Sequence, residues 1–271
     1  MPVVPIHASD DPRLADYANL RERDLRRVDE GLFVGEQWLV VERMLAIPGA
    51  TRSVLVSAPT AERLAPRIPD EVPVYVAPFD VLERIAGFNV HRGVLAIGRR
   101  AAIARPDLPS LIGDDATPAP RTLLLCEDIT HLDNIGLLFR NAAAFAVDGV
   151  LLSPRCHDPL YRKSLRVSIG HALTVPWRRS DDWLADLDEL RRRGFAIVGA
   201  AIDPGAVALD DLAPPPRTAL VVGTEFAGIQ PATRSRCDVL VRIPMAAGVD
   251  SLNVAVAAAV CLHRFSRRGR V

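Results

Sequence analysis

Short, continuous apolar runs alternate with longer segments of helical periodicity along the second half of the chain. Strands that are apolar on both faces are typical of a parallel sheet with helices on both sides, so the pattern predicts an α/β domain with a mostly parallel sheet. Ligands of such sheets bind beyond the carboxyl ends of the strands. The expected strands are 122–127, 149–152, 173–175, 196–200, 219–223 and 239–243, and the expected helices are 135–147, 161–169, 181–193, a short one from 231, and 252–267.

The first half shows the same alternation in shorter pieces. It predicts a small α/β layer domain that is separate from the larger sheet. Its expected strands are 32–34, 53–57, 72–76 and 93–98, and its expected helices are 16–29, 36–46, 61–64 and 78–85.

Residues 106–120 interrupt the alternation with a stretch rich in proline and turn formers that has no clear period. Such composition is typical of a linker. We therefore expect an N-terminal domain over 1–105, a linker over 106–120 and a C-terminal domain over 121–271, both domains being of ordinary size.

Composition narrows the class of protein. The 271 residues are 49% hydrophobic and 24% charged, which is ordinary for a globular protein. We find no apolar run of about 18 residues and no signal peptide, so we expect neither a membrane span nor secretion. The cysteines are far apart and no histidine cluster accompanies them, which argues against zinc and disulfides and fits a reducing cytoplasm. They are Cys126, Cys156, Cys237 and Cys261.

The charge pattern leaves two interpretations open. Lys+Arg and Asp+Glu are both 33, so no net field indicates a nucleic-acid partner. Lys163 is the only lysine, and the arginines gather in clusters. The planar guanidinium of arginine suits phosphate, but a GC-rich genome gives the same preference for arginine over lysine. For the cluster 191–193 a solvated helix face is the favoured interpretation. The clusters are 21–27, 99–105, 162–166, 178–179, 191–193 and 264–270.

The segment 134–147 is apolar almost all round, which predicts a buried helix. Arg140 lies in its middle and cannot lose its proton, so it must meet a carboxylate or open onto a polar cleft. Gly136, four residues earlier, leaves space above Arg140, and Asn134 is the expected N-cap. The alternative is a structural arginine–carboxylate pair with a routine cap.

A second polar segment follows the strand 219–223. Gly223 ends this strand and would let a ligand approach the backbone closely. Glu225 comes two residues later, at the carboxyl end of the strand. The alternative makes Gly223 a turn former and Glu225 a solvated loop residue.

A third segment, 243–253, is a proline-bent loop that leads into an alanine-rich helix. It places Asp250, Ser251 and Asn253 at a helix start, where free backbone N–H groups can hold a ligand. The alternative is an N-cap before a tightly packed core helix. We find no G-x-G in the chain, so a dinucleotide site of the Rossmann type is not expected.

Taken in order, these three segments resemble the three motifs of the SpoU (TrmH-type) RNA ribose 2′-O-methyltransferases, members of the SPOUT superfamily. The resemblance covers about 121–265, and 31–36 and 91–94 are similar to the start and end of the small RNA-binding domain common in that family. The motifs are Asn134-x-Gly136-x-x-x-Arg140-x-Ala142, Gly223-x-Glu225-x-x-Gly228, and Ile243-Pro244-Met245 followed by Ser251-Leu252-Asn253-x-Ala255-x-Ala257.

The resemblance implies a trefoil knot in the C-terminal domain and S-adenosylmethionine (SAM) bound bent in the knotted loops. It also implies a cytoplasmic homodimer that acts on structured RNA, either rRNA or tRNA, with 1–105 binding that RNA. No DNA, membrane or metal is implied. A non-catalytic RNA-binding or ribosome-assembly factor on the same scaffold is the alternative, and SAM binding distinguishes the two.

The resemblance also implies roles for single residues. Arg140 would be the catalytic arginine; because the pKa of a free guanidinium is above about 12, we expect it to position the 2′-hydroxyl or a phosphate, with the phosphate or Glu225 assisting proton removal. The remaining roles are shared: Asn134, Ser251 and Asn253 would orient the nucleotide and Arg140, while Gly223, Ile243 and Leu252, with Met245 and Thr174 nearby, would contact the cofactor.

Overall fold

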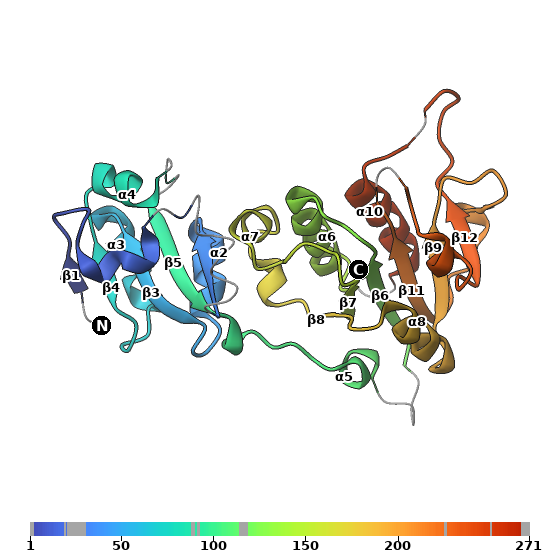
Figure 1. Cartoon of the computed structure of the whole chain (residues 1–271), viewed down its shortest axis with the longest axis horizontal. Helices are drawn as coiled ribbons and strands as arrows, with labels where there is room; N and C mark the ends of the chain where they lie inside the picture. Colours follow the sequence, from blue (N-terminus) through green and yellow to red (C-terminus); the bar gives the residue numbers. More distant parts are fainter. Residues whose placement is uncertain are drawn as a thin grey trace. The chain divides into compact units, whose positions relative to one another are not determined.

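The computed structural model describes residues 3–18, 20, 31–87, 90, 93–113, 119–224, 227–249 and 251–266. The chain divides into two compact units (Figure 1). The first comprises Met1–Ala104 and Leu160–Leu173, and the second comprises Arg105–Pro159 and Thr174–Val271. Of the predicted features, residues 91–92, Glu225 and Asp250 lie outside the described residues.

The first unit is built on a mixed five-stranded sheet in the order β1-β4-β3-β5-β2. β1, β4 and β3 run parallel, and β5 is antiparallel to both β3 and β2. Of the helix predicted over 16–29, residues up to Tyr17 belong to a 3-10 turn, η1 (Pro12–Tyr17), and nearly all the rest lies outside the described residues. The elements are β1 (Val3–Pro5), β2 (Leu32–Glu36), α2 (Trp38–Leu45), β3 (Thr51–Val56), α3 (Ala58–Leu64), β4 (Val74–Val76), α4 (Phe79–Ala86) and β5 (Val94–Arg99).

The helix α7 (Arg162–Val167) lies in the sequence between two strands of the second unit, but it packs within the first unit, against β2. Glu36, the last residue of β2, is 1% exposed. Arg162 Nη1 donates to Glu36 Oε2 at 2.5 Å, and Arg166 Nη1 lies 3.8 Å from Glu36 Oε1. A buried carboxylate needs such partners, so the arginine cluster at 162–166 is used to hold α7 in place.

The second unit is built on a seven-stranded sheet in the order β10-β12-β9-β11-β6-β7-β8, in which every pairing is parallel. The predicted α/β class with a mostly parallel sheet is therefore confirmed. The strands are β6 (Arg121–Cys126), β7 (Gly149–Leu152), β8 (Trp177–Arg179), β9 (Ala196–Ala200), β10 (Val207–Ala208), β11 (Arg217–Val222) and β12 (Val239–Arg242).

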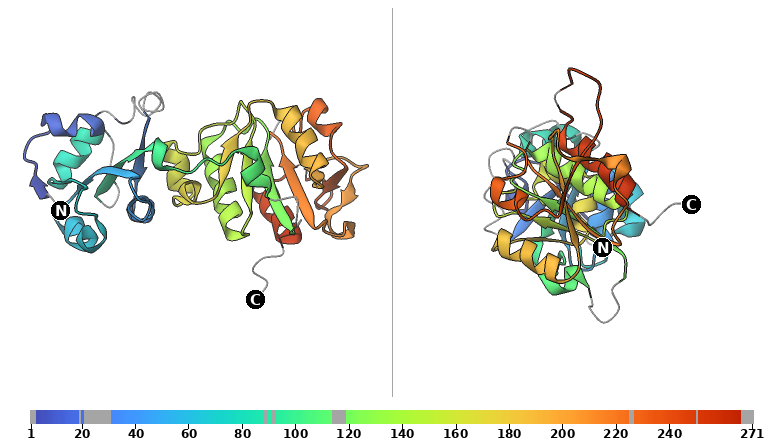
Figure 2. Two further views of the ribbon diagram at one scale, coloured as in Figure 1. Left: turned by 90° about the horizontal axis from the view of Figure 1, so that it is seen from below. Right: turned by 90° about the vertical axis from the view of Figure 1, so that its right-hand side faces the viewer.

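Helices cover both faces of this sheet (Figure 2). On one face, α5 (Leu108–Ile112) and α8 (Trp183–Arg192) bury apolar side chains against alternate strand residues such as Leu123 and Val221. On the other face, α6 (Leu132–Ala144) and α10 (Val254–Phe265) pack against each other and against neighbouring strands. The short α9 (Pro231–Arg234) follows β11 and packs beside α8. Because the strands carry apolar side chains on both faces, helices must cover both faces of the sheet, which gives this three-layer arrangement.

Two further predictions differ from the structure. The stretch expected to be a linker contains α5, because Asp107 Oδ1 accepts from Ser110 N at 2.9 Å and caps a helix whose proline lies in the first turn. The strand expected over 173–175 is wrong: β8 begins at Trp177. Pro176 has no N–H to donate to a ladder, and only its carbonyl pairs, with Val150 N at 2.9 Å.

The four cysteines are free thiols. Among the described residues no helix has both the length and the apolar character needed to cross a membrane. The knot and the separate roles of the two domains remain predictions.

Candidate functional site

A cavity of about 600 Å³ opens at the carboxyl ends of three neighbouring strands, β9, β11 and β12. This is where ligands bind to parallel sheets. Loops from distant parts of the sequence form its walls, including the loop that joins β12 to α10. Of the residues predicted to bind the cofactor or orient the nucleotide, those that line it are Gly223, Ile243, Met245, Ser251 and Leu252.

The chain turns back on itself at Gly223, on the wall of the cavity. Thr224 N donates to Gly228 O at 3.1 Å, and Gly228 N donates to Thr224 O at 3.0 Å. A Cβ at Gly223 would lie 2.1 Å from Gly228 O. Glycine is therefore required here by the crossing of the chain itself, which differs from the expected reason, close approach of a ligand.

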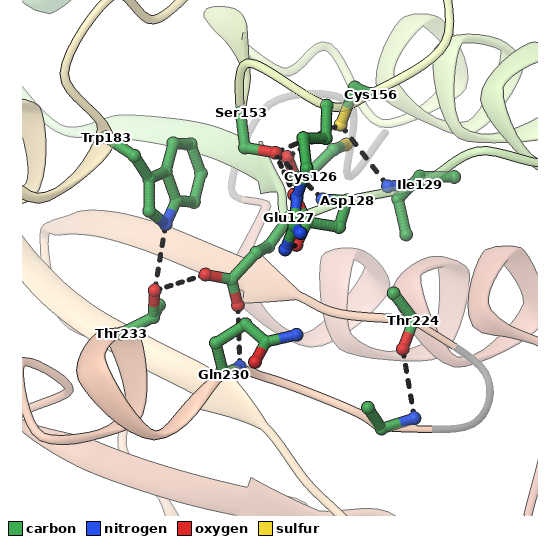
Figure 3. Close-up of polar contacts among 12 residues, drawn as sticks. Cys126, Glu127, Asp128, Ile129, Ser153, Cys156, Trp183, Thr224, Gln230 and Thr233 are labelled. Atoms are coloured by element: carbon green, nitrogen blue, oxygen red, sulfur yellow. Dashed lines mark hydrogen bonds and ion pairs between the residues drawn. The ribbon is translucent and has the colours of Figure 1, made fainter.

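The buried carboxylate of Glu127 binds residues that follow the turn at 223–228. Glu127, just beyond β6, is 3% exposed; its Oε2 accepts from Gln230 N at 2.8 Å and its Oε1 from Thr233 Oγ1. Trp183 Nε1 donates to the same hydroxyl at 2.9 Å (Figure 3). Because each partner is satisfied, the network fixes the start of α9 beside the cavity. The sequence predicts Glu127 as the last residue of a strand and indicates no role for it.

Asn134 and Asn253 meet across the packed helices α6 and α10. Asn253 Nδ2 donates to Asn134 Oδ1 at 2.9 Å, while Asn253 Oδ1 caps α10 by accepting from Ala255 N at 2.9 Å and Val256 N at 3.4 Å. The prediction that Asn134 is an N-cap is wrong, because α6 begins at Leu132 with His131 as N-cap. The side chain of Asn134 is instead buried and faces the third motif.

Arg140 is exposed, and among the described residues it has no hydrogen bond or ion pair. The expectation that its helix is buried all round is wrong. α6 covers one face of a sheet, so it buries Ile135, Leu138 and Phe139 and turns Arg140 to the surface. The guanidinium neither meets a carboxylate there nor lines the cavity.

The model of the SpoU rRNA Methylase family matches residues 121–263, which contain all three motifs. The chain belongs to this family. The resemblance seen in the sequence is thereby confirmed, and the protein is an RNA methyltransferase of the SpoU type.

Similar proteins match this chain over nearly its whole length. A Mycobacterium bovis protein named as an uncharacterized tRNA/rRNA methyltransferase is 39% identical over 96% of this chain and 90% of its own. The SpoU methyltransferase AviRb of Streptomyces viridochromogenes, solved in complex with the cofactor AdoMet, is 26% identical with a TM-score of 0.76, covering 94% of this chain and 97% of its own. An AdoMet-bound rRNA methyltransferase of Sinorhizobium meliloti shares the fold, with 21% identity, a TM-score of 0.81 and 99% coverage of both chains.

Four described residues proposed from the SpoU resemblance are absent from the described cavity lining: Asn134, Arg140, Thr174 and Asn253. Thr174 lies before β8, at the sheet edge opposite β12 and β10, and is absent from the cavity lining. The reason is topological, since β8 lies beyond β7 on the far side of β6. Glu225 lies outside the described residues, so its role stays a prediction.

Next to the first SpoU motif, Asp128 adopts a left-handed backbone with φ 55°. Ser153 Oγ donates to Asp128 Oδ1 at 2.8 Å and accepts from Asp128 N at 2.9 Å (Figure 3). Arg155 forms an ion pair with Asp128 Oδ2. Burial raises the pKa of this carboxyl, but the hydrogen bonds from Arg155 and Ser153 outweigh burial and hold its pKa below the usual value. These contacts fix the loop that leads into α6.

Of the predicted arginine clusters, 21–27 and most of 264–270 lie outside the described residues; described arginines of the other clusters, and Arg264, make contacts within the fold. Arg179 donates to the carbonyls of Pro154 and Cys156, at 2.9 and 2.6 Å, and Arg191 bonds Asp238 at 2.7 Å. Arg99 and Arg264 likewise donate to backbone carbonyls. The interpretation of these clusters as an RNA-binding charge pattern is therefore not needed to explain them.

The cavity also carries charge that the sequence analysis missed. Among its described lining residues, the charged ones are Asp203, Arg234 and Arg242. Only Asp203 had a usable signal, because an Asp-Pro-Gly turn begins three residues beyond the end of strand β9. Among the described residues, no three potential ligands from His, Cys, Asp and Glu gather as a metal site.

Proposed function

We propose that this protein transfers the methyl group of SAM to a ribose 2′-hydroxyl of rRNA or tRNA. The observation that carries the proposal is the cavity beyond β9, β11 and β12. Residues of the second and third motifs line it, and the hydrogen bond from Asn253 to Asn134 connects the first motif to the third. The AviRb structure with AdoMet, in the same family, supports SAM as the cofactor.

The residues of the cavity fit this cofactor. A volume of about 600 Å³ lies in the range that accommodates a drug-sized ligand. Ile229, Leu240 and Ile243 offer apolar surface to a flat adenine, and charged side chains stand on another wall. Gly223, Ile243 and Leu252 would hold the adenosine mainly through their backbone, with Met245 against it.

The bound cofactor supplies an electrophilic methyl carbon on a sulfonium. The ribose oxygen forms a bond to that carbon as the carbon–sulfur bond breaks, the sulfur keeps the bonding electron pair, and the hydroxyl proton leaves. The chain must therefore align the hydroxyl and provide a route for its proton. Asn134, Ser251 and Asn253 would orient the nucleotide, and a phosphate or Glu225 would accept the proton.

Arg140 would act by charge. An exposed guanidinium keeps its proton at any physiological pH, so it can attract a phosphate or polarise the 2′-hydroxyl but cannot serve as a base. Because its side chain is free of partners within the described part of the chain, it is available to RNA without first breaking an internal ion pair.

The proposal extends to a homodimer that acts in the cytoplasm, where rRNA and tRNA are made in bacteria. The described lining of the cavity includes neither Arg140 nor Asn134, so a second copy that brings its own Arg140 would complete the site. Val256 and Val260 on α10 are 50% and 39% exposed, which supplies apolar surface for such an association. The first unit would bind the RNA.

The test is methyl transfer from labelled SAM to total RNA of a strain that lacks the gene, followed by digestion to nucleosides. Label in a 2′-O-methyl nucleoside is the expected result, and separating rRNA from tRNA identifies the substrate class. Label in a base would contradict the ribose target. Absence of both transfer and SAM binding, measured by calorimetry, would favour the non-catalytic RNA-binding alternative.

A further inference from the structure

We infer that Asp203 and Arg234 bind the amino-acid end of the cofactor, Asp203 taking its α-ammonium and Arg234 its α-carboxylate. The inference rests on the proposed function, since it assigns part of the same cavity. It names charged residues that lie outside all three SpoU motifs.

The two side chains form one charged wall of the cavity. Asp203 follows β9 and Arg234 lies in α9, and an Arg234 Nη2–Asp203 Oδ2 ion pair joins them. Arg242 lies beside this wall, because its Nε donates to Ala206 O at 3.1 Å in the turn that Asp203 begins. A positive and a negative group side by side match a zwitterion, which a site of one sign would not.

The remainder of the described lining offers no comparable charge to this end of the ligand. The other described lining residues are uncharged, and most of them are apolar. A ligand with an adenine at one end and a zwitterion at the other therefore has one favourable orientation, with the heterocycle against the loop between β12 and α10 and the amino acid against Asp203 and Arg234.

Both groups have hydrogen-bonding capacity to spare. Asp203 Oδ1 accepts from Gly205 N at 2.7 Å and Oδ2 meets Arg234, but a carboxylate offers about four lone-pair sites. A guanidinium has five N–H donors, and the described structure uses few of those of Arg234. The side chains are 27% and 45% exposed, so a ligand can reach them. An ion pair this exposed adds little to stability.

Two nucleosides test the inference by calorimetry. S-adenosylhomocysteine carries the amino-acid end, and 5′-methylthioadenosine has the same adenosine and thioether without it. In Asp203→Asn and in Arg234→Gln, affinity for S-adenosylhomocysteine is expected to fall about tenfold or more, the loss of one charge-assisted hydrogen bond. Affinity for 5′-methylthioadenosine should stay within about twofold. Asparagine can still accept from Gly205 N, so the turn is kept.

Arg236→Gln is the matched control. Arg236 lies two residues beyond Arg234, pairs with Asp188 at 3.1 Å and does not line the cavity, so it should change neither affinity. Equal losses for both nucleosides, or no loss for either, would overturn the inference. If the unaltered protein binds neither nucleoside, the proposed function fails too. If it binds both and the variants show no selective loss, only the assignment of Asp203 and Arg234 fails.

Discussion

Asn253 Nδ2 and Asn134 Oδ1 lie 2.9 Å apart, although 119 residues separate them in the sequence. The amide of Asn253 is used at both ends, since its oxygen caps α10 while its nitrogen reaches α6. The cap fixes which way the amide points, and this leaves the donor directed at Asn134. The first and third motifs of the family thus share one hydrogen bond.

A double-mutant cycle should detect this bond. Asn253→Ala removes the cap and the bond, and is expected to lower the free energy of unfolding by about 1–2 kcal/mol. Asn134→Ala removes the bond and keeps the cap. The double variant should lose about 1 kcal/mol less than the sum of the single variants. Urea unfolding, followed by Trp177 and Trp183 fluorescence in a Trp38→Phe background, reports on the second unit; simple additivity would contradict the coupling.

Two glycines of the second motif should respond differently to substitution. Gly223→Ala places a Cβ against Gly228 O at 2.1 Å, so the turn must open and SAM affinity should fall at least tenfold. Gly228→Ala meets nothing within 4 Å among the described residues and has only its φ of +63° to strain it, at about 1–2 kcal/mol. Calorimetric titration of both variants with SAM decides the matter, and an equal effect would refute the steric argument.

Glu127→Gln should destabilise the second unit by about 1–3 kcal/mol. A glutamine has one acceptor oxygen where the carboxylate has two, so either Gln230 N or Thr233 Oγ1 loses its partner in a buried site. Asp188→Asn, at an ion pair on the exposed surface, is the control and should change stability by less than about 0.5 kcal/mol. Equal urea midpoints for the two variants would show that the network does not support the fold.

Acid should weaken the contribution of Asp128. A carboxyl whose pKa is lower in the folded than in the unfolded state stabilises the fold above the unfolded value, and loses that contribution as pH falls through the folded one. The pKa of Asp128 is shifted below 3.8, so the stability difference between the unaltered protein and Asp128→Asn should be constant above about pH 5 and shrink below about pH 4. Asparagine tolerates the left-handed backbone, which keeps the comparison fair. A difference that grows with acid would contradict the assignment.

Arg140→Ala should separate binding from transfer. The side chain is exposed and does not line the described cavity, so its removal should leave SAM affinity and the unfolding free energy nearly unchanged, within about 0.5 kcal/mol. Methyl transfer should be lost, and Arg140→Lys should recover only part of it because an ammonium lacks the planar fork. Lost SAM affinity with intact turnover would exclude Arg140 from the chemistry.

The sequence predicted the second unit well for a physical reason. Its strands are apolar on both faces and its longer helices are strongly periodic, so β7 and β9 were placed without error. The motifs also placed Gly223, Ile243 and Leu252 at one cavity, because carboxyl ends of parallel strands share an edge.

What the sequence could not reveal depends on contacts between distant residues. The exposed position of Arg140 depends on which face of α6 meets the sheet, and the partner of Asn134 lies on another helix. Arg234 carries no local signal at all. Its relation to Asp203 arises only because β9 and the loop before α9 end at the same edge.

The path of the chain through α7 limits how this protein can be divided. The first unit cannot be removed by deleting the amino-terminal residues alone, because its helix α7 lies in the sequence between β7 and β8 of the second unit. A shortened chain that began at Arg105 would keep Arg162 and Arg166 but lose Glu36, their buried counter-charge. Gain or loss of the first unit by gene fusion would therefore require matched changes inside the methyltransferase sequence, so the two units are expected to have evolved as one piece.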